Sequence, residues 1–366
     1  MTRSVAARRV ATPAGLVGPA RVGWDADGVI RSIEPVGSSA LDVELLAPGF
    51  VDLQVNGIDH LDVATADGAD WDVLASALAS QGTTSWCPTL ITAPRESYCG
   101  SLDRIAAAMD GQRAGQPCIV GVHLEGPFLG AAPGAHPVRH IAACDVDWLR
   151  ALPDIVRLVT LAPENPGAPE AITVLTGRGV VVALGHSRPD EDQIERAIAA
   201  GATMVTHLFN GMSGVHHREA GLALRTLVDD RLVAGLIADG VHVGDAALRL
   251  AVRAKGPNGI ALVTDAVAWR TMRPGGARLG WSEGAPRLPD GTLAGSTLTM
   301  DGAVRHLVRH CGVDLADALA MASTTPASLL RLADRGIIEP GRRADLVALD
   351  GRLEVAGVWV AGAAAA

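Results

Sequence analysis

The stretch "GFVDLQVN", residues 49–56, is the first of a series of apolar runs rich in β-branched residues. Near-continuous apolar runs of this length are typical of parallel strands that are buried on both faces. The polar residues at its end, Gln54 and Asn56, are two positions apart, so their side chains point to the same side of the strand. The run therefore predicts a buried parallel strand with a polar carboxyl end.

Seven further runs of the same kind follow along the chain. Helix-like stretches rich in Ala and Leu lie between most of them, such as residues 70–82, 190–201 and 244–256, and each ends in Gly. Eight strands with helical connections predict an α/β fold, a (β/α)8 barrel of the TIM type. A doubly wound sheet is the alternative, but no G-x-G-x-x-G follows the first strand. The seven runs are residues 83–91, 118–125, 154–162, 180–186, 203–209, 233–239 and 259–265.

The two ends of the chain differ from this alternating middle. Residues 1–46 read as short strands broken by Gly and Pro, and residues 341–362 have the same texture. We expect a small β-sandwich domain built from both termini, residues 1–46 with 338–366. Residues 47–337 are then the barrel domain.

Composition and charge exclude several classes of protein. The chain has 366 residues, 48% of them hydrophobic, and a net charge of -9, which argues against a nucleic-acid partner. No apolar run reaches the roughly 18 residues that a membrane span needs, and the first residues lack the apolar block of a signal peptide. The five cysteines form no C-x-x-C pair. We therefore expect a cytoplasmic protein whose thiols are reduced.

Residues typical of metal sites end three of the predicted strands. Glu125, His186 and His207 end the third, fifth and sixth runs, and functional residues of a barrel cluster at the carboxyl ends of its strands. A single His at such a position is more often structural. Two imidazoles and a carboxylate that converge on one mouth instead favour a catalytic zinc or iron site with an open position.

Two other polar residues at strand ends have more than one interpretation. Asp265 ends the eighth run, where a carboxylate can take a proton from a metal-activated water and deliver it to a leaving amine. It could equally cap a helix, because Asp often precedes one. His123 faces the same way as Glu125, but no histidine on the first strand could share a metal with it. We expect His123 to lie behind the ligands or in the barrel core.

Arg218 lies in a long polar segment, residues 207–221, beyond the sixth run. An arginine in a loop near a barrel mouth suits a phosphate or a carboxylate. The alternative is an arginine that is solvated and has no partner.

Ten short motifs in order extend these local interpretations. Together they resemble the N-acetylglucosamine-6-phosphate deacetylases of the amidohydrolase superfamily, and the resemblance covers essentially residues 47–350. A further segment, "PGRRADLVALD", resembles the return of the superfamily to its small β domain. The ten motifs are "PGFVDLQVNG", "GVHLEGPFL", "GAH", "TLAPE", "ALGHS", "THLFNGM", "HHRE", "IADGVHV", "LVTDA" and "LAGSTLTM".

The resemblance implies roles for the residues at the mouth. Glu125, His186 and His207 correspond to the ligands of one divalent metal ion per subunit, with zinc first and iron, manganese or cobalt as alternatives. Asp265 corresponds to the catalytic acid and base. His136, in "GAH", corresponds to a substrate-contacting histidine that helps to polarise the acetyl carbonyl.

The resemblance also implies a sugar-phosphate pocket. Asn210 and Gly211 correspond to part of that pocket, Arg218 and His242 resemble the phosphate-binding pair, and Leu298 lies where the family shapes the acetyl end. In the family the arginine comes from the neighbouring subunit, which implies a homodimer.

The implied reaction is hydrolysis of N-acetyl-D-glucosamine 6-phosphate to D-glucosamine 6-phosphate and acetate. The same scaffold could instead deacetylate N-acetylgalactosamine 6-phosphate or another N-acyl compound, or bind a metabolite without catalysis. The chain departs from many members at Ala220, where they have Pro, and at Gly211, where they have Ala. It also has "GIDH" at residues 57–60, where many are Gly-rich.

Gln54 and Asn56 bear on the number of metal ions. The superfamily often has H-x-H at the end of the first strand, where it holds a second metal, whereas this chain has Gln-Val-Asn. Amide oxygens bind transition metals weakly compared with imidazole. We therefore expect one ion per subunit, with Gln54 and Asn56 making hydrogen bonds in the place of a second ion.

Overall fold

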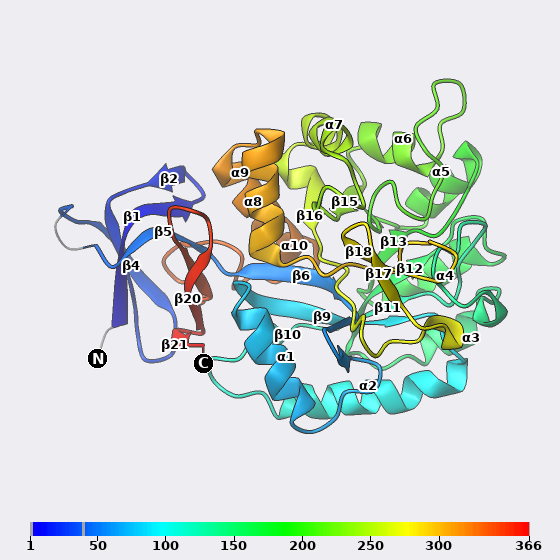
Figure 1. The fold of residues 1–366 in the computed structure, drawn as a ribbon, viewed down its shortest axis with the longest axis horizontal. Coiled ribbons are helices and arrows are strands. Elements are labelled where there is room, and N and C mark those ends of the chain that lie inside the picture. The colour runs from blue at the N-terminus through cyan, green and yellow to red at the C-terminus, as the bar shows by residue number, and fades with distance from the viewer. Residues whose placement is uncertain (1–2, 39–40, 366) are drawn as a thin grey trace.

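A barrel of parallel strands forms the larger part of the computed structural model, which describes residues 3–38 and 41–365 (Figure 1). Neighbouring strands pair in parallel around the barrel, so the predicted (β/α)8 barrel is confirmed. The strands in barrel order are β6 (Phe50–Val55), β9 (Thr83–Ile91), β11 (Val122–Glu125), β12 (Val156–Leu161), β13 (Val181–Leu184), β14 (Met204–Val205), β15 (Val233–Leu236) and β16 (Ile260–Leu262), and the short β10 (Cys118–Ile119) precedes β11.

The seam between the first and last strands is closed by a few specific contacts. The Asn56 N–H donates to the Ala266 carbonyl over 2.8 Å, and Val55 and Ala266 form an isolated parallel bridge. Below them the Thr264 hydroxyl donates to the Asp52 carboxylate over 2.6 Å. These contacts hold the chain after β16 against the end of β6, which brings the end of the last strand next to the end of the first.

Helices connect most of the barrel strands. The predicted helical stretches correspond to α1, α5 and α7, and α5 begins with a capping box in which Asp190 and Gln193 exchange hydrogen bonds. The helices are α1 (Asp70–Ala79), α2 (Arg95–Asp110), α3 (Val146–Arg150), α4 (Ala168–Gly177), α5 (Glu191–Ala199), α6 (Leu222–Val228), α7 (Asp245–Lys255), α8 (Met300–Cys311), α9 (Leu315–Ala322) and α10 (Thr324–Leu329), with 3-10 turns at Val138–His140, Pro257–Gly259 and Pro274–Gly276.

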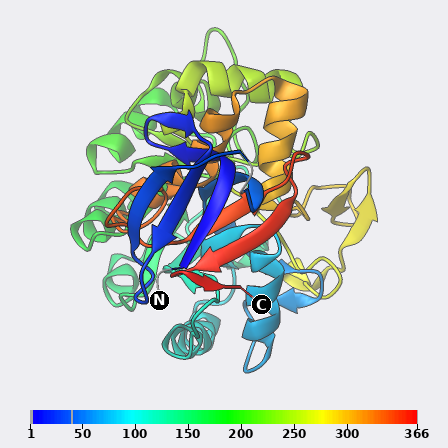
Figure 2. The same cartoon turned by 90° about the vertical axis from the view of Figure 1, so that its left-hand side faces the viewer.

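Strands from both ends of the chain form a separate eight-stranded sheet, which faces the viewer in Figure 2. β5 is its link, because it pairs in parallel with β1 and antiparallel with β19. The domain boundaries at residues 46/47 and 337/338 stay a prediction, and residues 1, 2, 39, 40 and 366 lie outside the described chain. The strands are β1 (Arg3–Thr12), β2 (Gly15–Val17), β3 (Ala20–Trp24), β4 (Ile30–Pro35), β5 (Val43–Pro48), β19 (Leu346–Leu349), β20 (Val355–Val360) and β21 (Ala363–Ala364).

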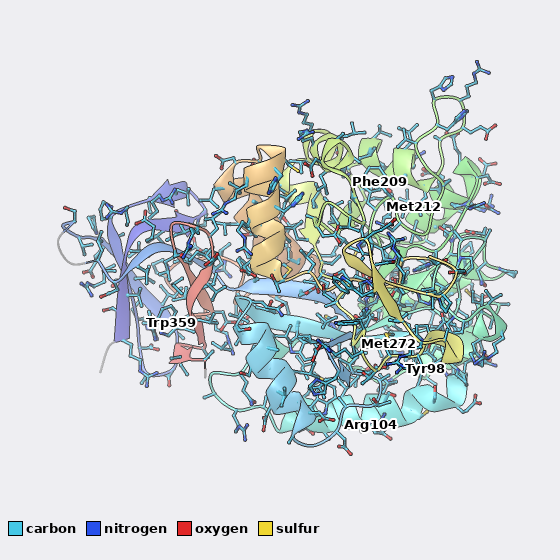
Figure 3. The ribbon with its side chains drawn as sticks, viewed as in Figure 1. Tyr98, Arg104, Phe209, Met212, Met272 and Trp359 are labelled. Carbon is cyan, nitrogen blue, oxygen red and sulfur yellow. The ribbon has the colours of Figure 1, made fainter. Side chains whose placement is uncertain are left out.

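The segment between β16 and α8 covers the carboxyl end of the barrel. It contains a hairpin, β17 (Gly280–Ser282) with β18 (Ala285–Arg287), and a small apolar cluster of its own that includes Met272. A second short pair, β7 (Gly57–Ile58) with β8 (Leu61–Asp62), follows β6. Figure 3 labels Met272 in the cover and Trp359 in the small sheet at the other end of the molecule.

Apolar side chains from strands around the barrel, among them Leu53 and Leu158, pack together in its interior. His123 lies in this interior, where its Nε2 is 2.8 Å from the Thr160 hydroxyl, and burial lowers its pKa to about 4. His123 is therefore a barrel-core residue, one of the two roles expected for it. Among the helices of the described chain, none is long and apolar enough to cross a membrane.

Candidate active site

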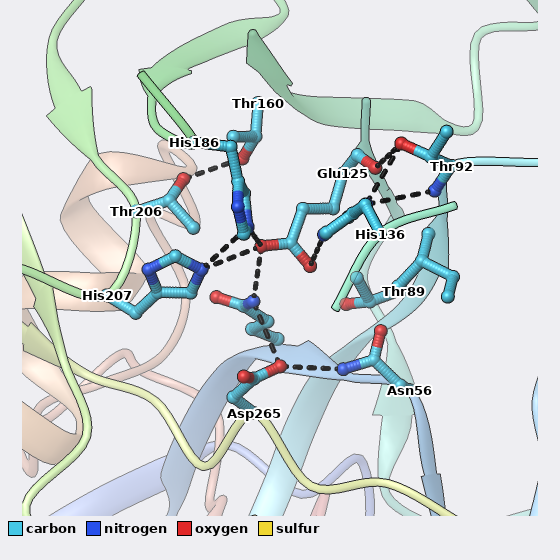
Figure 4. A network of polar contacts seen from close by, with 12 residues as sticks. Asn56, Thr89, Thr92, Glu125, His136, Thr160, His186, Thr206, His207 and Asp265 are labelled. Carbon is cyan, nitrogen blue, oxygen red and sulfur yellow. Dashed lines mark hydrogen bonds and ion pairs between the residues drawn. The ribbon is translucent and has the colours of Figure 1, made fainter. Parts of the chain in front are cut away.

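Glu125, His186 and His207 meet at the carboxyl end of the barrel (Figure 4). The Glu125 Oε1 lies 3.1 Å from the His186 Nε2 and 2.9 Å from the His207 Nε2, and the two imidazole nitrogens are 3.1 Å apart. Nitrogen and oxygen ligands of a tetrahedral zinc lie about 3.3 Å from one another. The three strand ends thus place two imidazole nitrogens and a carboxylate oxygen in a triangle of nearly that size.

The surroundings of the triangle prepare its atoms to bind a cation. The His186 Nδ1 is 3.1 Å from the Ala132 carbonyl, to which it can donate, and this leaves the Nε2 lone pair for a metal. All three residues are buried. Burial alone would raise the pKa of Glu125, but the adjacent His186 and His207 imidazoles hold it well below its ordinary value. A buried carboxylate and two imidazoles with this geometry fit a divalent ion.

His136 lies beside the triangle, with its Nε2 3.8 Å from the Glu125 Oε2 and its ring centre 4.2 Å from that of His186. It is close enough to be a ligand, but the triangle atoms are closer together and share the other carboxylate oxygen. The Thr92 N–H donates to the His136 Nδ1, which leaves the hydrogen on Nε2. Burial lowers the pKa of His136 to about 3, so the ring is neutral. His136 is therefore arranged as a hydrogen-bond donor.

Asp265 follows the last strand and is held by the amides of the first. Its Oδ1 accepts hydrogen bonds from the Gln54 Nε2 over 3.1 Å and from the Asn56 Nδ2 over 2.7 Å. The Gln54 Nε2 also donates to the Glu125 Oε1 over 3.1 Å, so this amide links the two carboxylates. Desolvation, together with the nearby Glu125 charge, raises the pKa of Asp265 to about 7. The helix-cap alternative does not hold, because the next described helix, α8, begins at Met300.

Three of these residues adopt a backbone conformation that side chains rarely take. His186, His207 and Asp265 have φ angles of 49°, 29° and 49°. Such conformations cost free energy and concentrate where side chains must be aimed at a common point. The turn at each strand end therefore directs the side chain into the mouth.

A hollow of about 180 Å³ opens above the triangle. Asn210 and Gly211 line it, as the resemblance implied. A Cβ on Gly211, whose φ is 57°, would lie 2.8 Å from the His186 Nδ1, so glycine suits this position where many members have alanine. The lining residues are Ile91, Glu125, Gly134, Ala135, His136, His186, His207, Asn210, Gly211, Ile237, His242, Asp265, Val267, Met272, Pro274, Thr292, Leu293, Ala294 and Gly295.

His242 lines the same hollow, although its side chain is only 3% exposed. Its Nδ1 lies 2.7 Å from the Asp239 Oδ2, and its Nε2 has no hydrogen-bond partner in the described chain. The Asp239 Oδ1 also accepts from the backbone N–H groups of Val241 and His242. Sequence reasoning assigned no site role to Asp239 or to Thr92. The spacing D-G-V-H, which sets Asp239 three residues before His242, could have indicated Asp239, but no sequence signal indicates Thr92.

Arg218 and Leu298 lie outside the lining of this hollow. Arg218 is exposed on the projecting loop between β14 and α6 (Figure 1), in a separate surface hollow that also includes Arg188. Leu298 packs partly buried against the core, while Leu293 and Gly295 of the same motif line the site. Within one subunit the structure therefore brings together all the predicted catalytic and metal residues but not these two.

Two other departures from the family pattern, Ala220 and His60, lie in loops. Ala220 is in the same projecting loop as Arg218, and its side chain is half-buried. His60 is exposed, with its Nδ1 3.0 Å from the Asp59 Oδ2. Asp59 also pairs with Arg270, so this loop is tied to the cover.

Comparison with known proteins shows the family to which the chain belongs. Residues 45–365 match the model of the amidohydrolase family. Among curated relatives, the N-acetylglucosamine-6-phosphate deacetylase of Bos taurus is 41% identical, over 87% of this chain and 82% of its own. The N-acetylgalactosamine-6-phosphate deacetylase of Escherichia coli O157:H7 is 40% identical, over 99% of both chains.

Solved structures give the same result. The N-acetylglucosamine-6-phosphate deacetylase of Thermotoga maritima has a TM-score of 0.92 at 30% identity and covers 99% of both chains. A mutant of the Mycobacterium smegmatis enzyme, in complex with N-acetyl-D-glucosamine-6-phosphate, has a TM-score of 0.90 at 32% identity and also covers 99% of both chains. The chain belongs to the amidohydrolase family and, within it, to the N-acetylhexosamine-6-phosphate deacetylases.

Proposed function

We propose that this protein hydrolyses the N-acetyl group of N-acetyl-D-glucosamine 6-phosphate to D-glucosamine 6-phosphate and acetate. The observation that carries the proposal is one hollow that contains a metal-ligand triangle, a carboxylate held by two amides and an unpartnered imidazole nitrogen. The two relatives named for this reaction, with 41% and 30% identity, support the substrate.

The proposed mechanism gives each residue of the mouth a task. Glu125, His186 and His207 would hold one divalent ion, zinc foremost, and an ion bound there would supply Lewis acidity to a water molecule and to the acyl carbonyl. Asp265 takes a proton from the attacking water and then delivers it to the departing amine. The His136 Nε2–H donates to the carbonyl oxygen as negative charge develops on it.

The remaining residues orient the reacting groups. Gln54 and Asn56 hold Asp265 in place through its Oδ1, which leaves its other oxygen for the proton transfers. The free Nε2 of His242 suits a phosphate oxygen, and Asn210 and Gly211 border the same space. Binding energy from a distant phosphate then positions the amide at the triangle.

A release assay tests this reaction and its alternatives. Acetate release is measured from N-acetylglucosamine 6-phosphate, from its galactosamine isomer and from unphosphorylated N-acetylglucosamine. We expect the first to be the best substrate and the unphosphorylated sugar to lose at least about tenfold in kcat/KM, since it lacks the charged anchor. The Escherichia coli relative favours the galactosamine isomer as the second candidate. Release of acetate from none of the three would favour the inactive metabolite-binding alternative, and release only from unrelated N-acyl compounds would overturn the substrate class.

Metal analysis tests the number of ions in the mouth. We expect one ion per subunit there, zinc or alternatively iron, manganese or cobalt, because imidazole and carboxylate ligands accept all of these. Substitution His186→Ala should release this ion and abolish turnover. A second ion bound through Gln54 or Asn56 would contradict the proposal.

We also propose a homodimer in which Arg218 serves the site of the neighbouring subunit. Its guanidinium is exposed and makes no ion pair with any described residue, and it lies outside the hollow of its own chain. Co-expression of Arg218→Ala and Asp265→Asn subunits distinguishes the two arrangements. If Arg218 acts across the interface, each mixed dimer has one complete site, so random assembly restores about a quarter of the wild-type activity. If it acts within its own subunit, the mixture stays inactive.

The cysteines support a cytoplasmic location. All five are free thiols, two of them buried, which is the pattern expected in a reducing compartment. Mass spectrometry of the native protein after alkylation without reductant should find all five thiols unpaired.

A further inference from the structure

A second cluster of metal-binding side chains lies at the contact between α7 and α8. These helices are neighbours on one side of the barrel (Figure 1). Asp245 is the first residue of α7, and His306 and Cys311 belong to α8. One ligand atom from each, a carboxylate oxygen, an imidazole nitrogen and the sulfur, lies within 4.8 Å of the other two.

The contacts within the cluster show that its side chains face one another. The His306 Nε2 is 2.9 Å from the Asp245 Oδ1, and the Cys311 Sγ is 4.0 Å from the Asp245 carbonyl. Oxygen, nitrogen and sulfur atoms at these separations need only small shifts to surround one ion. His310 stacks on His306 with 4.8 Å between ring centres, so a second imidazole one turn along α8 lies beside the cluster.

The mixture of ligands indicates which ions would bind. A thiolate, an imidazole and a carboxylate favour a borderline transition metal such as zinc or cobalt over magnesium or calcium, which prefer oxygen. Asp245 and His306 are partly exposed, so an ion can enter from solvent. The ligands proposed at the mouth of the barrel are imidazoles and a carboxylate, so of these two clusters in the described chain the α7–α8 cluster is the one with a sulfur ligand.

We propose that Asp245, His306 and Cys311 form a second, peripheral transition-metal site that braces the loop carrying His242. The loop runs from Asp239 to Gly244, directly before α7. A Cβ on Gly240 would lie 2.7 Å from the His306 Cε1, which shows how closely the loop backbone packs on this ring. An ion that fixes His306 to Asp245 would fix the base of the loop on both sides. Each ion bound through Cys311 displaces the thiol proton to solvent.

The site is tested by adding cobalt(II) chloride to the purified holoenzyme and recording absorption. A cobalt ion bound to a thiolate gives an intense near-ultraviolet charge-transfer band, which an ion at the mouth cannot give. We expect the wild type to develop the band with one equivalent, and Cys311→Ser to lose it. His306→Ala should need at least tenfold more cobalt. The matched control is Cys99→Ser, which removes an exposed cysteine of α2 and should behave as wild type.

Several outcomes would overturn the proposal. Absence of the band in the wild type, its persistence in Cys311→Ser, or its loss in Cys99→Ser would each do so. Acetate release by Cys311→Ser within about twofold of wild type shows that this variant is folded. If Cys311→Ser does not fold, Asp245→Asn is used in its place.

Hydrogen exchange tests the bracing of the loop. Cobalt should slow exchange in residues 239–245 severalfold in the wild type but not in Cys311→Ser. If cobalt changes the exchange rates equally in the wild type and in Cys311→Ser, the ion does not brace the loop. The absorption band and the exchange rates report metal binding alone and do not depend on the proposed reaction, on which only the folding control by acetate release rests.

Discussion

Two aspartates at the seam of the barrel show how position separates a structural carboxylate from a catalytic one. Asp52, on β6, accepts hydrogen bonds from the backbone N–H groups of Gln54 and Thr264 and from the Thr264 hydroxyl. Asp265, after β16, accepts from the side-chain amides of Gln54 and Asn56. Each strand thus offers donors to the carboxylate of the other, and desolvation raises the pKa of both.

The two aspartates differ in what their carboxylates face. Asp52 is fully buried in the barrel wall, where nothing but the protein can reach it. Asp265 lines the hollow beside Glu125, where a substrate can reach it. A raised pKa alone therefore does not identify a catalytic residue, whereas a raised pKa beside a cavity and a metal triangle is a reason to expect one.

Substitution of Asp265 by Asn should give the largest effect. The side chain keeps its size but cannot accept and return a proton, so we expect kcat to fall by at least about 10³-fold. Metal content and the thermal midpoint should be close to wild type. The measurement is acetate release with parallel metal analysis, and a variant with near-normal kcat would remove Asp265 from the mechanism.

Asp52→Asn should change the stability of the protein and not its activity. The rise of its pKa from 3.8 to about 6 means that the folded protein holds the Asp52 proton more tightly than the unfolded chain does. The stability from this group is present below pH 4 and is lost as the pH rises to about 6, a loss of about 3 kcal/mol. Asp52→Asn should therefore gain stability over wild type between pH 4 and 7.

Thermal midpoints at several pH values check this, and acetate release should stay within about twofold of wild type. The nearby Cys87 does not interfere, because burial raises the pKa of its thiol and keeps it protonated. A constant difference in midpoint from pH 4 to 7 would show that Asp52 has an ordinary pKa.

The part of the site that could be predicted from sequence is the part that ends a strand. Glu125, His186 and Asp265 end near-continuous apolar runs, which are typical of buried parallel strands, and a barrel brings all such ends together. The predicted bounds of the sixth strand were wrong. Residues 203–209 were expected to form one strand, but β14 is only Met204–Val205. The chain turns there because His207 and Phe209 have positive φ angles, which no residue type in the run signals.

The contacts that orient the site could not be predicted, because they join residues that are distant in sequence. Gln54 was expected to make hydrogen bonds, but its link between Glu125 and Asp265 depends on how the seam closes. The Thr92 contact with His136 depends on a loop that follows no pattern. The expectation for Arg218 depends on a second subunit, on which one chain gives no information.

Substitution of Gln54 by Leu tests the hydrogen-bond donor that Asp265 has and Asp52 lacks, a side-chain amide. It removes the Nε2 that donates to both Glu125 and Asp265 but leaves the Gln54 backbone N–H that donates to Asp52. Residues that orient a metal site in this way typically contribute 10- to 100-fold, so we expect kcat to fall by about that factor. Asn56→Leu is the matched control for the bond to Asp265 alone. A loss equal to that of Asp265→Asn would mean that Gln54 has a chemical role of its own.

Asp190 extends the comparison to a carboxylate that is exposed and lies far from the seam. It caps α5 by accepting the Gln193 N–H over 2.7 Å, and the Gln193 side chain accepts from the Asp190 N–H over 2.9 Å. Asp190→Ala should lower the free energy of unfolding by about 1 kcal/mol, because the cap is lost, and should leave acetate release unchanged. Asp190→Ser keeps a capping oxygen and should recover most of that loss. If Asp190→Ala and Asp190→Ser destabilise the protein equally, the stability of α5 does not depend on the capping oxygen, and Asp190 has no capping role.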